Sequence, residues 1–145
     1  MTTGSPNPFP TGRFLPAPEL PVESQPWGQV TWLSRPDLTG AQHLTAMQVL
    51  LNPGAGHGFH FHPNQEEFIL VLSGRIEQWL EREHRILGPG DLVFIPKALV
   101  HASYNLFDQP ARVLPILSPC IGDGYEVVNL FDQAPWKDLK GAPHA

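Results

Sequence analysis

The sequence is poor in cysteine and in long apolar runs. Cys120 is the single cysteine among 145 residues, which excludes an internal disulfide framework. No stretch approaches the roughly 18 apolar residues of a membrane-spanning helix, and the N-terminus lacks the charged and apolar parts of a secretory signal peptide. We therefore expect a soluble, cytoplasmic protein with no membrane partner. Cys120 is either a small buried apolar side chain or a reactive thiol.

Positive charge is also scarce. The chain has 9 Lys and Arg residues against 14 Asp and Glu residues, and the basic residues form no stripe. A nucleic-acid partner is therefore not expected. A length of 145 residues suits one domain with its own hydrophobic core.

Proline and glycine, in contrast, are abundant, with 17 and 13 residues. Residues 1–26 carry seven of the prolines, which fix φ and lack a donor, so we expect an extended, irregular N-terminal arm. This arm is either flexible or bound to a neighbouring subunit. The expected organisation is the arm at 1–26, a barrel at 27–132 and a frayed tail at 133–145.

Between the arm and the tail, short apolar segments are separated by turn residues. Strands are expected at 29–33, 44–51, 57–62, 67–72, 76–81, 85–87, 92–95, 100–105 and 112–117. Residues 35–40 are expected to form a turn-rich loop, 125–131 an edge strand and 135–139 a helical turn. No segment has a long helical period, so the pattern predicts an all-β sandwich or barrel.

Two histidines spaced two apart are the first functional signal. On a strand His60 and His62 project from the same face, roughly 6 to 7 Å apart at the backbone. Two imidazoles inside an apolar pocket are costly unless a metal ion or an acid satisfies them.

The surrounding spacing resembles the two motifs of the cupin family. The first motif matches at Gly54, His60, His62, Glu67 and Gly74, and the second at Gly90, Pro96, His101 and Asn105. One departure is Ala98, where the family usually has glycine. The resemblance covers about residues 27–117 and implies a double-stranded β-helix, also called a cupin or jelly-roll barrel.

The resemblance places His60, His62, Glu67 and His101 on the family's four metal-ligand positions. Three imidazoles and one carboxylate suit a divalent transition metal ion (Fe, Mn, Ni, Co, Cu or Zn) better than Ca or Mg. Glu66 competes with Glu67, but neighbours on a strand point to opposite faces, and the interval to Gly74 favours Glu67. The alternative is a degenerate cupin that keeps these residues and binds no metal.

Other polar residues are weaker candidates. His57 is expected at the barrel mouth as a general base or substrate contact, or equally as a surface histidine between two glycines. Gln48, Ser103 and Asn105 are candidates for the interior, and Asn105 is expected to fix a turn. His43, His84 and His144 are expected in solvent, and Lys97 is expected to point outward.

An apolar interior without an obvious cation favours a small neutral or weakly acidic organic substrate, aromatic molecules among them. The large apolar residues Met47, Val49, Leu51, Ile69, Val71, Phe94 and Ile116 are candidates for the interior, and alternation should bury about half of them.

The resemblance, to quercetin dioxygenase-like cupins in particular, implies a metal-dependent dioxygenase, in which the ion binds an enolate or phenolate oxygen and Glu67 also exchanges protons. The alternatives are a Lewis-acid enzyme without oxygen (an isomerase, dehydratase or cyclase) and a non-catalytic small-molecule or metal-binding cupin. Cupins commonly pair, so we expect a homodimer.

Overall fold

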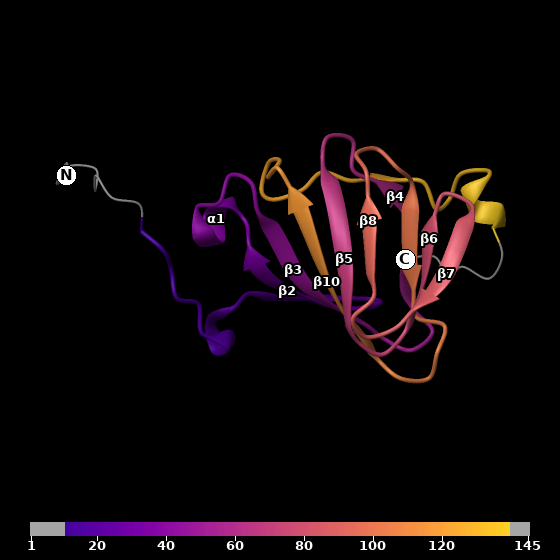
Figure 1. Cartoon of the computed structure of the whole chain (residues 1–145), viewed down its shortest axis with the longest axis horizontal. Helices are drawn as coiled ribbons and strands as arrows, with labels where there is room; N and C mark the ends of the chain where they lie inside the picture. Colours follow the sequence, from indigo (N-terminus) through magenta and orange to yellow (C-terminus); the bar gives the residue numbers. More distant parts are fainter. Residues whose placement is uncertain (1–10, 140–145) are drawn as a thin grey trace.

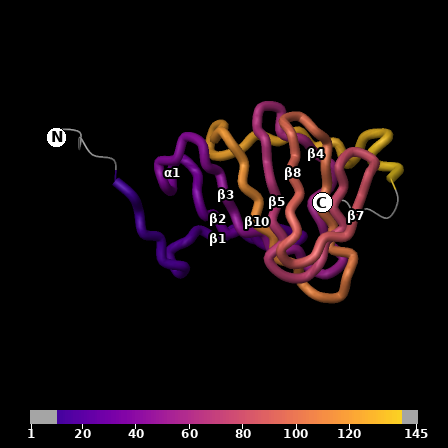
Figure 2. The backbone as a smooth tube through the Cα atoms, in the orientation of Figure 1, coloured from indigo at the N-terminus to yellow at the C-terminus, as the bar shows by residue number. Residues whose placement is uncertain are grey.

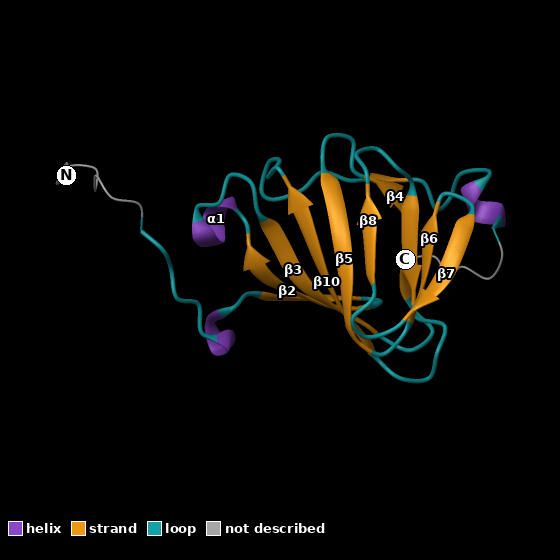
Figure 3. Cartoon of the chain, in the orientation of Figure 1, coloured by secondary structure: helices purple, strands orange, loops and turns teal. Residues whose placement is uncertain are grey.

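Short β-strands are the main regular secondary structure of the computed structural model, which describes residues 11–139 (Figure 3). The strands are β1 (Val22–Gln25), β2 (Gly28–Ser34), β3 (Thr45–Leu51), β4 (Gly56–Phe61), β5 (Glu66–Ser73), β6 (Ile76–Leu80), β7 (Glu83–Leu87), β8 (Leu92–Ile95), β9 (His101–Tyr104), β10 (Ala111–Ser118) and β11 (Val128–Asn129). The helical segments within this range are single turns, η1 (Ala17–Glu19), α1 (Pro36–Thr39) and η2 (Trp136–Asp138). None of the helices in the described part is long and apolar enough to cross a membrane.

The strands form two antiparallel sheets (Figure 1). One sheet has the order β1-β2-β3-β10-β5-β8 and the other β11-β4-β9-β6-β7. Strands distant in sequence pair within each sheet, as when Val113 of β10 lies opposite Val49 of β3 and Val71 of β5. The expected all-β jelly-roll barrel is confirmed.

The N-terminal arm is more ordered than its sequence predicts. Residues Val22–Gln25 form the edge strand β1 and pair with β2 from Val22↔Thr31 to Gln25↔Gly28. Pro21 and Pro26 flank this strand without interrupting it, and an edge strand tolerates proline nearby because one row of its N–H groups has no partner in the sheet. Residues 11–16 run away from both sheets (Figure 2). Binding of this arm to a neighbouring subunit stays a prediction.

Two further elements differ from expectation. The loop predicted at 35–40 contains the single turn α1, because Pro36 is preorganised for a first helical position and Gly40, with φ 75°, ends the turn in a left-handed conformation. The edge strand predicted at 125–131 is limited to β11, which pairs Val128 with Phe61 and Asn129 with His60.

The hydrophobic core lies between the sheets and follows side-chain alternation. Five of the seven apolar candidates for the interior are buried, namely Met47, Val49, Leu51, Ile69 and Val71. Phe94 is 54% exposed and Ile116 is half-buried, because both alternate to the outer face of their sheet. A second buried cluster forms around Phe59 and Trp79 of the other sheet, against Trp136 and Leu139 of the C-terminal segment.

A register shift in β4 turns His57 towards the interior. His57 lies opposite Ser103 and His60 lies opposite His101, so three steps along β4 match two steps along β9. An extra residue of this kind reverses the alternation of side chains. His57 therefore joins His60 on the inner face, although strict alternation would separate them.

Ala98, the departure from the family motif, adopts the glycine-like conformation. Its φ is 67°, in the left-handed region that side chains with a Cβ rarely occupy. The Ala98 N–H donates to the His62 carbonyl at 2.9 Å, so the turn contacts the backbone of a predicted ligand.

We expect Ala98→Gly to stabilise the protein by about 0.5–1 kcal/mol. Glycine removes the left-handed strain, and its greater freedom in the unfolded chain offsets part of this gain. Urea denaturation of both proteins measures the difference. A lower midpoint for Ala98→Gly would show that the alanine methyl group makes contacts worth more than the strain it causes.

Candidate metal centre

A small cavity of about 70 Å³ lies between the two sheets and contains the predicted ligands in its wall. Most of the wall is apolar, formed by Trp27, Val30, Met47, Val49, Leu51, Ile69, Val113, Pro115 and Leu117. The polar and aromatic remainder is His57, His60, His62, Glu67, His101, Ser103 and Tyr125. None of the described residues in this wall is Lys or Arg.

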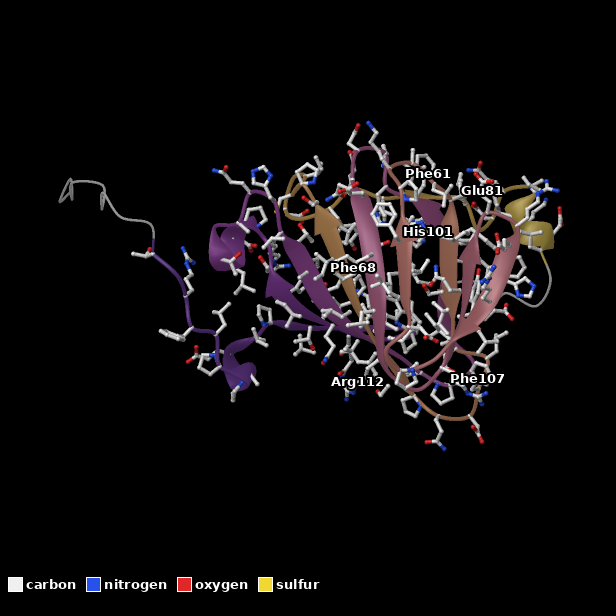
Figure 4. All side chains as sticks on the ribbon, viewed as in Figure 1. Phe61, Phe68, Glu81, His101, Phe107 and Arg112 are labelled. Carbon is white, nitrogen blue, oxygen red and sulfur yellow. The ribbon has the colours of Figure 1, made fainter. Side chains whose placement is uncertain are left out.

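The structure brings the four predicted ligands together from three strands. His60 lies on β4, His62 directly follows it, Glu67 lies on β5 and His101 on β9. All four are buried, with exposed fractions from 1% to 6%. The three histidines offer nitrogen atoms within 4.8 Å of one another. Figure 4 labels His101 among the strands.

Main-chain carbonyls orient all three imidazoles. The Nδ1 atoms of His60, His62 and His101 contact the carbonyl oxygens of Gly58, Glu126 and Leu99 at 2.6, 2.7 and 2.9 Å. A carbonyl only accepts hydrogen bonds, so a neutral imidazole must donate from Nδ1 and keep a lone pair on Nε2. Such contacts fix ligand orientation in metal sites.

The inward-facing atoms lack the partners that burial demands. In the described part of the chain, His62 Nε2, His101 Nε2 and Glu67 Oε1 are buried without a hydrogen-bond partner. Glu67 Oε1 lies 3.0 Å from His101 Nε2 and 3.6 Å from His62 Nε2. Lone pairs this close need a proton or a cation between them. The donor set therefore fits a divalent transition metal ion.

Burial and charge keep the carboxylate ionised and two imidazoles neutral. Burial lowers the pKa of His60 well below 6.5, and the neighbouring His57 and His101 add to this shift. Burial also lowers the pKa of His57 to about 4, with His101 contributing. Burial raises the pKa of Glu67, but contacts with His101 and His62 outweigh it and bring the pKa to about 2. These are the protonation states that metal binding requires.

The pKa of His62 shifts in the opposite direction. Burial lowers its pKa, but the contact with Glu67 and the carbonyl of Glu126 raise it above 6.5 overall. Metal binding at His62 therefore competes with protonation more strongly than it does at His60.

The metal-free protein should lose stability as the pH falls from about 6.5 to 4. His57 and His60 protonate near pH 6.5 when unfolded but resist protonation when folded, so the unfolded state binds more protons in this window. His62 opposes the effect, since its raised pKa favours the folded state at low pH. We expect a net loss on the order of 3 kcal/mol, measured by urea denaturation in a chelator.

His57→Phe is the matched control for this pH effect because it keeps a stacked ring and removes one titrating group. The variant should show a shallower decline between pH 6.5 and 4. Equal declines in the two proteins would contradict the role given to His57.

Glu66 points away from the centre. It is exposed, whereas its neighbour Glu67 is 6% exposed and faces the cavity. The structure thus separates the two adjacent acids as strand alternation predicts.

His57 is not the surface turn residue that was its alternative interpretation. It lies on β4 in the cavity wall, stacked between His60, with ring centroids 4.0 Å apart, and Trp27, with centroids 5.9 Å apart. Its imidazole therefore lies beside a predicted ligand and faces the cavity.

The segment after β10, residues 119–127, closes over His62 and was missed in the sequence. Glu126 supplies the carbonyl that orients His62, and its N–H donates to Gln65 Oε1 at 3.1 Å. Gln65 is 1% exposed and also donates to the carbonyls of Pro119 and Gly124 at 2.7 and 3.1 Å. The contributing groups are mostly carbonyls, which carry no sequence signature. Gln65, directly before the two glutamates, was the available signal.

Aromatic cavity residues were missed as well. Tyr125 lies 5.9 Å from His62 between ring centroids, and Trp27 reaches His57 from the far side. Burial raises the pKa of Tyr125, with Glu23, Asp123 and Glu67 contributing, so its phenol stays protonated near neutral pH.

The remaining candidates divide between interior and surface. Ser103 faces the cavity and donates to Gln78 Oε1 at 2.6 Å. Asn105 fixes its turn through the carbonyls of Leu51 and Gln109 and the N–H of Phe107.

Gln48 was wrongly expected inside: it alternates to the outer face of β3. His43, His84 and Lys97 are exposed as expected, and His144 lies outside the described residues. Cys120 is half-buried, and its Sγ accepts a hydrogen bond from Thr45 Oγ1 at 3.3 Å.

Comparison with known proteins agrees with this geometry. Residues 47–117 match the family model described as "Cupin domain". Polyketide synthase CurC from Streptomyces cyaneus is 30% identical over 107 residues, which cover 74% of this chain and 70% of that protein. Quercetin 2,3-dioxygenase from Bacillus subtilis is 38% identical over 68 residues, but these cover 46% of this chain and 20% of that protein.

The fold has a similar solved counterpart of nearly the same extent. The structure of KdgF from a Halomonas species superposes with a TM-score of 0.69 at 27% identity, covering 78% of this chain and 98% of KdgF.

Proposed function

Because the chain belongs to the cupin family, we propose that it is a metal-dependent enzyme acting on a small neutral or weakly acidic organic molecule. His60, His62, Glu67 and His101 would hold one ion of Fe, Mn, Ni, Co, Cu or Zn. When bound, such an ion acts as a Lewis acid that stabilises negative charge on a carbonyl or phenol oxygen and, if redox-active, supports reaction with O2.

One observation carries this proposal: buried donor atoms without partners converge in the wall of an otherwise apolar cavity. Leaving such groups unpaired inside a protein is costly, so a resident ion explains why the chain keeps them. The absence of Lys and Arg among the described wall residues argues against strongly anionic substrates. Trp27 and Tyr125 favour a substrate with a planar apolar part.

His57 is the proposed general base. Its pKa of about 4 leaves it neutral near pH 7, and its ring faces the cavity beside His60. Because the low pKa makes His57 a weak base, it would accept a proton only from an enol or phenol whose acidity the bound ion raises. Glu67, ionised and in contact with His62 and His101, would exchange protons as well as bind the ion.

Dioxygenation is the first candidate reaction. The similarity to quercetin 2,3-dioxygenase, 38% over 68 residues, supports it, as does a cavity suited to phenols and enols. In this reaction the chain would orient the substrate oxygen, remove its proton and exclude bulk water while O2 reacts.

A Lewis-acid reaction without oxygen is the second candidate. The relative named as a polyketide synthase is matched over 70% of its length, far more than the dioxygenase. Polyketides are rich in enolisable carbonyl groups, so an isomerisation, dehydration or cyclisation of such a compound would use the same charge stabilisation and the same base.

Oxygen dependence separates the candidates. Protein loaded with each of the six metals would be incubated with flavonols, β-diketones and aromatic polyketide mimics, with and without O2. Dioxygenation predicts O2 consumption matched to product, and Lewis-acid chemistry predicts equal turnover without O2. Tight binding of these compounds without turnover for any metal would overturn the enzyme proposal in favour of a binding protein.

We also propose that the chain works in the cytoplasm as a homodimer with no nucleic-acid or membrane partner. The mild net charge of −5 argues against a nucleic-acid partner, and the exposed apolar residues support the homodimer.

A further inference from the structure

The three predicted histidine ligands differ in what orients their rings. For His60 and His101, the carbonyl that accepts from Nδ1 belongs to the residue two positions earlier, so each ring is oriented by its own local segment. For His62, the accepting carbonyl belongs to Glu126, which is 64 residues further along the chain. The orientation of His62 therefore depends on a distant part of the fold.

The main chain of His62 is already held, which leaves its ring as the variable part. Its carbonyl accepts from the Ala98 N–H at 2.9 Å. Rotation about the side-chain bonds would move both ring nitrogens without breaking that contact. While Nδ1 donates to the Glu126 carbonyl, Nε2 stays 3.6 Å from Glu67 Oε1. The group that fixes the Glu126 carbonyl therefore also fixes the metal-binding atom of His62.

Gln65 holds the main chain that leads to this carbonyl. Its Oε1 accepts from the Glu126 N–H at 3.1 Å. Its Nε2 donates to the carbonyls of Gly124 and Pro119 at 3.1 and 2.7 Å. The side chain is 1% exposed, so water does not compete for these bonds. Both ends of the amide are thus used on residues 119–127, in the segment that runs from β10 towards β11 of the other sheet (Figure 1).

The same hydrogen bonds enclose Tyr125. Gln65 binds the residues on either side of it, Gly124 and Glu126. The Tyr125 ring lies in the cavity wall and stacks on Trp32, with ring centroids 5.9 Å apart. One buried amide therefore sets the place of a predicted metal ligand and of an aromatic ring that faces the cavity.

We propose that Gln65 is a positioning residue of the metal centre, which orients His62 through the main chain of Glu126 and holds Tyr125 in the cavity wall. The inference rests on the proposed metal site, but it concerns hydrogen bonds that form without a metal. Gln65 lies in the turn between His62 and Glu67, so it ties both ligands to the segment that closes over them. Losing a contact that orients a metal ligand typically lowers metal affinity about 10–100-fold.

Nitrogen NMR of the metal-free protein tests this role without depending on metal binding. Long-range proton–nitrogen spectra at about pH 9, above the ordinary histidine pKa, show which ring nitrogen carries the proton. All three ligands of the native chain should carry it on Nδ1. In Gln65→Met, a side chain of similar length without an amide, His62 should show a mixture of both forms while the other two ligands stay unchanged. Nuclear Overhauser contacts of the Tyr125 ring should weaken as well.

The matched control is Thr45→Val. Thr45 is buried like Gln65 and donates to the Gly124 carbonyl at 2.5 Å, so its loss loosens the same segment without removing a contact to Glu126. It should leave the proton of His62 on Nδ1. If Gln65→Met does not fold, Gln65→Asn replaces it, because it keeps an amide on a side chain one methylene shorter. The same change in His62 is expected.

Isothermal titration with Zn²⁺ measures the consequence for the site. Affinity should fall at least about 10-fold in Gln65→Met and stay within about two-fold in Thr45→Val. A His62 ring that keeps its proton on Nδ1 in Gln65→Met, or that changes equally in Thr45→Val, would overturn the positioning role. Equal Zn²⁺ binding by the native and Gln65→Met proteins would do the same. A native chain that binds no metal would instead overturn the proposed function, and the NMR spectra would still decide whether Gln65 orients His62.

Discussion

His60→Ala is expected to reduce the bound metal from about one ion per chain to less than about 0.1 and to abolish turnover. His60 is 3% exposed, and its Nδ1 donates to the Gly58 carbonyl, which fixes the position of its Nε2. Loss of a hydrogen bond that orients a metal ligand already lowers metal affinity by about 10–100-fold, and loss of the ligand itself should lower it more. Metal analysis after gel filtration measures the content.

The control for this variant is His84→Ala. His84 is on β7, with half of its side chain exposed, and should not affect metal content. Circular dichroism should show that both variants keep the β fold. Full metal content in His60→Ala would remove the basis for the site, and equal losses in both variants would attribute the effect to general instability.

Glu67→Gln is expected to lower turnover by about 10³-fold and metal affinity by about 10² or more. The amide keeps the shape of the carboxylate but removes the negative charge that offsets the ion. It also removes the ionised group with a pKa near 2 that contacts His101 and His62. Isothermal titration with the preferred metal and initial rates with the best substrate give the two quantities.

Glu66→Gln is the matched control, because it makes the same chemical change one residue earlier on the exposed side of β5. Its metal affinity and turnover should stay within about two-fold of the native values, as for surface substitutions in general. If Glu66→Gln were instead the inactive variant, the assignment of Glu67 to the centre would be wrong.

Local alternation explains why so much of the centre was predictable. His60 and His62 are two residues apart at the end of β4, so alternation alone indicates that they share a face, and the resemblance to the first cupin motif added Glu67. The second motif then located His101 and the turn at Ala98, whose φ of 67° fits the glycine position of the motif. Short segments bounded by glycine and proline likewise predicted the barrel strands to within a residue or two.

Contacts between distant parts of the chain were not predictable in this way. Tyr125 and the Glu126 carbonyl reach His62 from more than sixty residues away, through a segment whose local sequence has no strong signal. Strand β1 forms inside a proline-rich arm because β2 offers it an edge to pair with. Each depends on a partner that sequence spacing does not identify.

From the sequence, the resemblance to the two cupin motifs indicated the fold class and the four candidate ligands, and strand alternation with the interval to Gly74 favoured Glu67 over Glu66. Only the tertiary structure placed His57 beside His60, since the register shift against β9 reverses the alternation locally. It also decided which side of the six-stranded sheet is covered and which, with Phe94, faces outward. A strand carries its period in its sequence, but what lies against each of its faces depends on the rest of the chain.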